Sequence, residues 1–156
     1  MIQKIAKEFK FKGCVFKQLK RNGDVALYEQ IIDDDVSRFE LIIIKVCDER
    51  EIMGRKYPKM EVYPTKEQWG SLALTYLTYK DAYIAYEDLV NFRKSKRKPD
   101  FNNYYIIDKN KTKYLTEKRT SMGLFIAYEI LLKRDKTLIG SYIDKNIALS
   151  VFRNSA

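Results

Sequence analysis

The sequence of 156 residues contains no histidine. Histidine is the commonest general base, the commonest metal ligand and the usual sensor of pH near neutrality. Its absence excludes catalytic triads that are built on histidine. The six glycines stand too far apart for a P-loop or a GxGxxG turn. Because no other motif of catalytic quality occurs, we expect a protein that is not an enzyme and that uses no cofactor.

Only two cysteines occur, Cys14 and Cys47, and they are neither clustered nor arranged as CxxC. We interpret them as buried thiols in a reducing compartment. The longest apolar run is far below the ~20 residues of a membrane span. The first twelve residues alternate lysine with apolar side chains, unlike the apolar core of a signal peptide. These features predict a soluble, cytoplasmic protein with no membrane partner.

Acidic side chains that could bind a catalytic metal ion occur together at one place only. This place is the run Asp33-Asp34-Asp35, with Glu40 and Lys45 nearby. Metal-dependent nucleases need two or three acidic ligands and often a lysine near the scissile phosphate. Successive aspartates in a turn point in different directions, however, and an aspartate-rich loop is usually solvated. We therefore predict no metal site.

Positive charge is the strongest feature that the composition shows. The chain has 30 Lys and Arg residues against 21 Asp and Glu residues, a formal net charge of +9. Residues 1–90 carry 15 basic and 15 acidic side chains, so the whole excess lies in residues 91–156. Such a one-sided field attracts polyanions, and each lysine or arginine that neutralises a phosphate releases a counterion. The alternative is that the charge serves solubility alone.

The first half of the chain has the pattern of antiparallel strands. Asn22-Gly23 between two apolar-rich runs is a strong hairpin signal and predicts that strands near 8–19 and 24–32 pair. Gly13 shifts the phase of the first run and indicates a bulge. Residues 39–47 are apolar on both faces, which is typical of a central strand. A short edge strand is expected at 59–63.

A helix is predicted over residues 79–94. Thr78 and Asp81 form a capping box before it, and its aromatic stripe favours packing against the sheet over base stacking. A second capping box, Thr65 with Gln68, predicts a short helical turn that places Trp69 in the core.

Apolar residues at helical spacing also predict helices over most of the C-terminal region. Expected are a helix from Met122 to Leu132, a helix over 136–143, a tight turn at 144–146 and a last helix over 147–153. Residues 104–107 fit either a short strand or the start of the helices. The predicted fold class is α+β, with a small antiparallel sheet backed by a helix over 1–94. A basic linker at 95–100 and a basic, mainly helical region over 101–156 complete it.

The pattern of helix, turn and helix at the C-terminal end resembles a helix-turn-helix, with Ile139, Ile143, Ile147 and Val151 packing its corner. The turn Asp144-Lys145-Asn146 lacks the usual glycine, and an ordinary helical hairpin docked on the sheet is the alternative. In a helix-turn-helix, Asn146 and Arg153 could contact base edges. The residues expected to contact nucleic acid are Arg93, Lys94, Lys96, Arg97, Lys98, Arg119, Lys133, Arg134, Lys136, Lys145, Asn146, Ser150 and Arg153.

Three segments resemble small proteins of unassigned function that tailed bacteriophages and related elements encode. They are Asn22-Gly23-Asp24-Val25-Ala26-Leu27-Tyr28-Glu29, Glu51-Ile52-Met53-Gly54-Arg55-Lys56-Tyr57-Pro58 and Tyr63-Pro64-Thr65-Lys66-Glu67-Gln68-Trp69-Gly70. The resemblance covers about the first 90 residues and implies a viral protein that acts in the host cytoplasm. Two hypotheses of different class follow. The first is a protein that binds nucleic acid, DNA before RNA. The second is an inhibitor of a host protein complex that handles nucleic acid, which either competes with nucleic acid through the same basic surface or imitates phosphates with the acidic turn at 33–35.

Overall fold

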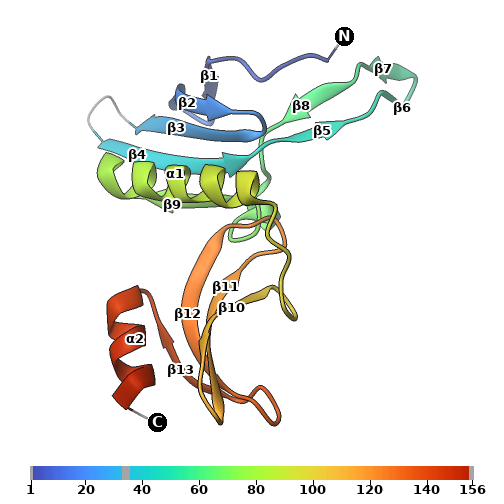
Figure 1. The fold of residues 1–156 in the computed structure, drawn as a ribbon. Coiled ribbons are helices and arrows are strands. Elements are labelled where there is room, and N and C mark those ends of the chain that lie inside the picture. Colours follow the sequence, from blue (N-terminus) through green and yellow to red (C-terminus); the bar gives the residue numbers. More distant parts are fainter. Residues whose placement is uncertain (1, 33–35, 155–156) are drawn as a thin grey trace. The chain divides into compact units, whose positions relative to one another are not determined.

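The computed structural model describes residues 2–32 and 36–154, about half of which lie in antiparallel strands (Figure 1). The chain forms two compact units, Met1–Asn91 and Phe92–Ala156. Each unit contains an antiparallel sheet and packs a helix against it, so the prediction of a mainly helical C-terminal region is wrong. No helix in the described part of the chain is long and apolar enough to cross a membrane.

The first unit is built on a five-stranded antiparallel sheet with the order β1-β2-β3-β4-β9. Its strands are β1 (Glu8–Phe11), β2 (Cys14–Asn22), β3 (Val25–Ile32), β4 (Val36–Ile43) and β9 (Ala73–Tyr76). The predicted hairpin at Asn22-Gly23 is confirmed, because β2 pairs with β3 and Asn22 lies opposite Val25. The predicted bulge at Gly13 is instead a hairpin turn. Lys12 and Gly13 both have positive φ, at 50° and 83°, and they join β1 to β2.

Both faces of this sheet are buried, as the central strand predicted over 39–47 implies, but that run divides into β4 and a separate short strand at Lys45–Cys47. Helix α1 (Tyr79–Ser95) lies along the face that carries Leu27 and Leu41, and its own buried residues include Tyr86 and Leu89. Half of the predicted capping box is confirmed: Thr78 Oγ1 accepts a hydrogen bond from the Asp81 backbone N–H at 3.1 Å, whereas the Asp81 carboxylate accepts one from the Thr78 hydroxyl at 2.7 Å. Burial of such an apolar stripe stabilises a helix more than its intrinsic propensity does.

Aromatic rings fill the opposite face of the same sheet. Phe9 stacks on Phe16 with 4.9 Å between ring centres, and Tyr63 meets both rings and Tyr28 edge to face. Trp69 follows the short 3-10 helix η1 (Lys66–Gln68), which the Thr65 capping box begins as predicted. Its ring contacts Tyr63 but stays partly exposed, so Trp69 lies at the edge of the core rather than inside it.

A two-stranded arm extends from β4 (Figure 1). It consists of two antiparallel pairs: β5 (Lys45–Cys47) with β8 (Met60–Val62), and β6 (Arg50–Ile52) with β7 (Arg55–Tyr57). The edge strand predicted at 59–63 is therefore confirmed as β8, whereas the outer hairpin was not expected. Cys14 and Cys47 are free thiols and half-buried, not fully buried as expected.

The second unit is a four-stranded antiparallel sheet with one helix packed on it. The strands follow chain order: β10 (Tyr104–Lys109), β11 (Lys113–Arg119), β12 (Phe125–Leu132) and β13 (Leu138–Tyr142). Helix α2 (Lys145–Asn154) packs Ala148 and Phe152 onto Leu115 and Ile130 of the sheet. Asp144 caps this helix, since its Oδ1 atom accepts hydrogen bonds from the backbone N–H groups of Asn146 and Ile147 at 2.7 and 3.0 Å.

Two predicted helices of this unit are strands. Residues 122–132 are apolar at almost every position because β12 is an inner strand that is buried on both faces, and a short apolar run does not distinguish such a strand from a helix. Residues 138–142 form the edge strand β13, with Ile139 and Ile143 exposed rather than packed in a corner. Only the last predicted helix, over 147–153, is confirmed. Without a helix over 136–143, the helix-turn-helix loses its first element.

Candidate nucleic-acid interface

The sheet of the second unit has two chemically different faces. Directly opposite residues of an antiparallel pair share a face, and successive residues alternate. Leu115 lies opposite Ile130 on the face that α2 covers. Tyr114 and Thr116 therefore point to the other face. Tyr104 joins them there, because it lies opposite Lys118.

Three aromatic rings form a continuous patch on this second face. The Phe101 ring stacks on Tyr104 with 5.3 Å between centres and lies 5.9 Å from Tyr114. All three side chains are half-buried. Thr116 and Leu131 belong to the same face by register and are almost completely buried. The three rings, in contrast, present part of their surface to solvent.

Three lysines lie over these rings. The Nζ atom of Lys118 is 5.2 Å from the centre of Tyr104, that of Lys133 is 5.2 Å from Tyr114, and that of Lys136 is 4.9 Å from Phe101. Such distances allow a cation to interact with the electron-rich face of a ring. The set Phe101, Tyr104, Tyr114, Lys118, Lys133 and Lys136 is called the ring–lysine face below.

One carboxylate anchors the ring–lysine face from beneath. Glu129 is buried, accepts a hydrogen bond from Tyr104 Oη at 2.8 Å, and pairs with Lys118 Nζ at 3.2 Å. The hydrogen bond to Tyr104 raises the pKa of Lys118 more than burial lowers it, so this lysine stays charged. Glu129 compensates that charge. Lys133 and Lys136 therefore supply the positive charge of the face that remains free for a phosphate.

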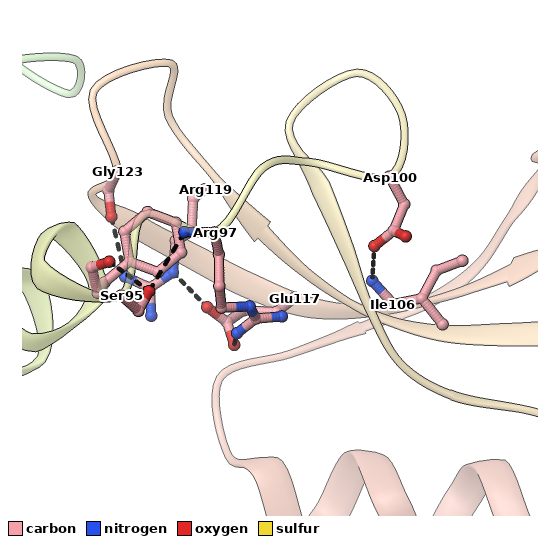
Figure 2. A network of polar contacts seen from close by, with 8 residues as sticks. Ser95, Arg97, Asp100, Ile106, Glu117, Arg119 and Gly123 are labelled. Carbon is pink, nitrogen blue, oxygen red and sulfur yellow. Dashed lines mark hydrogen bonds and ion pairs between the residues drawn. The ribbon is translucent and has the colours of Figure 1, made fainter.

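A second network, around Glu117 of β11, includes two of the predicted arginines, Arg97 and Arg119 (Figure 2). Arg119 is only 4% exposed; its Nε atom donates to the Glu117 carboxylate and its Nη1 atom donates to the Gly123 carbonyl at 2.9 Å. Its guanidinium also lies 4.1 Å from the centre of the Phe92 ring. The expectation that Arg119 contacts phosphate is therefore wrong, because burial and pairing withdraw its charge from the surface.

The basic run at 93–98 begins inside α1 rather than in a free linker. Arg93 and Lys94 lie in the last helical turn, where positive charge complements the helix dipole. Lys96 adopts φ 51°, which is typical of the residue that ends a helix. Arg97 is 44% exposed; its Nη1 atom lies 3.8 Å from Glu117 and its guanidinium 5.1 Å from the centre of Tyr105. Lys98 is exposed.

The predicted contact residues do not form one surface. Lys133 and Lys136 come together on the ring–lysine face, and the exposed Arg134 between them pairs with Asp135 at 3.1 Å. Helix α2 packs on the opposite face of the sheet. It carries the four exposed residues Lys145, Asn146, Ser150 and Arg153.

Sequence reasoning missed Phe101, Tyr104, Tyr114 and Lys118. The signal was present as an alternation of two, in Tyr104-x-Ile106 and in Tyr114-x-Thr116-x-Lys118, which places these side chains on one face of a strand. Because the segment that follows is predicted to be helical, no neighbouring strands are expected that could form a sheet with these residues.

The acidic residues considered for a nuclease give no metal site in the described chain. Asp33, Asp34 and Asp35 lie outside the described residues. Glu40 is buried on the aromatic face of the first sheet, where it accepts a hydrogen bond from Tyr63 Oη. Over residues 2–32 and 36–154, no group of three or more acidic or cysteine side chains is placed to hold a metal ion.

Comparison of the chain with known protein families, with curated proteins and with solved structures gave no match. The geometry of the ring–lysine face therefore carries the functional argument.

Proposed function

We propose that the protein binds single-stranded nucleic acid without catalysis, through the ring–lysine face. The observation that carries this proposal is that Lys118, Lys133 and Lys136 lie over a patch of three aromatic rings on one sheet face. Stacking rings interleaved with cations are what a protein needs to hold unpaired bases and their phosphates. DNA is the ligand we expect first.

The energies favour exchange of Lys133 and Lys136 for bases on the rings, while Lys118 stays paired with Glu129. A cation over a ring contributes about 0.5–1 kcal/mol at an exposed site. A base stacked on an aromatic side chain contributes about 1–3 kcal/mol, and a displaced lysine can then neutralise a phosphate. A single strand that lies across Tyr104 and Tyr114 thus gains both the stacking of its bases and the neutralisation of its phosphates. Paired bases inside a duplex offer no free ring face to Tyr104 or Tyr114.

The sheet suits this task because its two faces are separately stabilised. Helix α2 covers the opposite face, so a ligand on the ring–lysine face does not need to displace a helix. Glu129 fixes Tyr104 and Lys118 through hydrogen bonds, which limits the conformational entropy lost on binding. Thr116 donates its hydroxyl to the Glu129 carbonyl at 2.9 Å and holds β11 against β12 beneath the rings.

The test is a titration of labelled single-stranded and duplex DNA with the full chain, by fluorescence anisotropy, over about 50–300 mM salt. We expect tighter binding of the single strand, with an affinity that falls as salt rises. Equal weak binding of both forms, or none at 50 mM salt, contradicts the proposal. That result favours the hypothesis of an inhibitor that binds a host protein.

A further inference from the structure

The outer hairpin of the first unit is exposed on every strand residue. Strands β6 (Arg50–Ile52) and β7 (Arg55–Tyr57) have no buried side chain, and Met53 and Gly54 join them in a tight turn. A hairpin that buries nothing does not contribute to the core of its unit. Its side chains are therefore free to serve an external partner.

The register divides the hairpin into two unlike faces. Arg50 lies opposite Tyr57 and Ile52 lies opposite Arg55, so these four side chains share one face. Glu51 and Lys56 lie opposite each other on the other face and compensate each other's charge. One face thus presents two arginines, an isoleucine and a tyrosine, without an acidic residue among its strand positions.

Met53 stands at the tip of this hairpin and is 98% exposed. Its φ of 50° lies in the left-handed region, which a residue with a side chain enters at an energetic cost and which glycine enters freely. This geometry is that of a two-residue hairpin turn, as at Lys12 and Gly13. The turn holds a flexible apolar side chain in solvent at its tip.

We propose that the β6–β7 hairpin is a second nucleic-acid site, which enters the minor groove of duplex DNA with Met53 as a wedge between base pairs. Proteins that bind in this way insert an apolar side chain at a base step and neutralise the flanking phosphates with basic residues. Arg50 and Arg55 come from different strands of the hairpin, so each can reach a different backbone of the groove. Neither has an ion-pair partner within the described part of the chain.

The charge pattern favours DNA over an apolar protein groove or a lipid surface. A groove in a protein would accept Met53 and Ile52 but leave two arginines to be desolvated, which is costly without paired acids. A lipid surface would attract all basic side chains of the hairpin, Lys56 on the opposite face included. A DNA groove instead offers phosphates to Arg50 and Arg55 and an apolar base step to Met53, whereas the charge of Lys56 is opposed by Glu51 across the hairpin.

Arg55→Ala and Lys56→Ala make the test, because these neighbours lose the same charge from opposite faces. Binding of the full chain is measured by anisotropy with a duplex of about 20 base pairs that contains central TA steps, which unstack easily. We expect Arg55→Ala and Arg50→Ala to weaken duplex binding by about threefold each, and Lys56→Ala to leave it almost unchanged. Equal losses for Arg55→Ala and Lys56→Ala overturn the proposal.

Met53→Gly tests the wedge in the same duplex with 2-aminopurine at the TA step. The wild-type chain should raise the 2-aminopurine fluorescence by unstacking the base, and Met53→Gly should abolish the rise without lowering the melting temperature, since glycine relieves the positive φ. No rise with the wild-type chain overturns the proposal. Vesicles of phosphatidylcholine and phosphatidylserine provide a second check. The proposal is also overturned if the wild-type chain binds these vesicles, and Met53→Gly abolishes vesicle binding but retains duplex binding.

This site is independent of the ring–lysine face. Single-strand binding by Arg55→Ala and Met53→Gly should equal that of the wild type, and duplex binding should survive Tyr114→Ala. These variants therefore distinguish failure of one site from failure of the other.

Discussion

The ammonium group of Lys136 lies 4.3 Å from the centre of the Tyr114 ring, between that ring and Phe101. The lysine follows the turn at 133–135 and precedes β13, with φ 61°, and the tyrosine stands on β11. The two side chains are 22 positions apart in sequence, and the β11–β12–β13 meander brings them together. This pair joins the two properties of the proposed interface, a stacking surface and a positive charge.

Tyr114→Ala should weaken binding of a single-stranded oligonucleotide by about tenfold, because one base loses its stacking partner. Tyr114→Phe retains the ring and should bind within about twofold of the wild type. Anisotropy titrations of the full chain measure both. Equal affinity of Tyr114→Ala and the wild type would show that no base stacks on this ring.

Lys136→Ala should lower the slope of log affinity against log salt by about 0.7, the value for one phosphate on a single strand. Lys145→Ala is the matched control, because it removes the same charge from α2, which packs on the opposite face of the sheet. Its slope should equal that of the wild type. The reverse order of the two variants would instead place the nucleic acid on the helix.

The contrast between Lys136 and Lys145 shows how far sequence reasoning reaches. Charge counting located the basic excess in residues 91–156, and hairpin and capping signals identified the first sheet and α1. Strand β12 cannot be distinguished from a helix by its sequence, because a strand that is buried on both faces has no alternation. The short edge strand β13 is exposed at most positions and carries no alternation either. Helices in place of these strands leave the aromatic residues of β10 and β11 without a sheet face.

Arg119 offers a prediction on stability. Arg119→Ala removes a buried guanidinium and leaves Glu117 without its closest partner, so the free energy of unfolding should fall by about 3–5 kcal/mol. Arg97→Ala should cost at most about 1 kcal/mol, since this arginine is 44% exposed and 3.8 Å from the same carboxylate. Urea denaturation of the two variants tests the difference. Similar losses for both would contradict the network in Figure 2.

Glu40 gives the first unit a dependence on pH. Burial raises the pKa of Glu40 above its ordinary value of 4.5, although the hydrogen bond from Tyr63 opposes this. The folded state therefore favours the protonated carboxyl, and its contribution to stability is present below pH 4.5 and is lost as pH rises through the folded pKa. Glu40→Gln stays neutral, so its stability relative to the wild type should increase between pH 4.5 and 8. A constant difference over that range would contradict this.

Glu61 should show the opposite dependence. Its two carboxylate oxygens pair with Arg21 at 2.6 and 2.9 Å, and this hydrogen bonding lowers the pKa of Glu61 below 4.5. The stabilisation is present above pH 4.5 and is lost as pH falls through the folded pKa. Glu61→Gln should therefore cost about 1–3 kcal/mol at pH 7 and progressively less in acid. Urea denaturation at pH 7 and pH 3 measures this; a cost that is equal at both would contradict the pairing.

The most direct test of the account is photochemical crosslinking of the full chain to a single-stranded oligonucleotide that carries 5-iodouracil, followed by mass spectrometry of the peptides. Iodouracil reacts with aromatic side chains on which it stacks. The account predicts crosslinks in the peptides that contain Phe101, Tyr104 or Tyr114, and their loss when excess unlabelled single strand competes. Crosslinks confined to α2 or to the first unit, or none at low salt, would contradict the assignment of the ring–lysine face as the site that binds single strands.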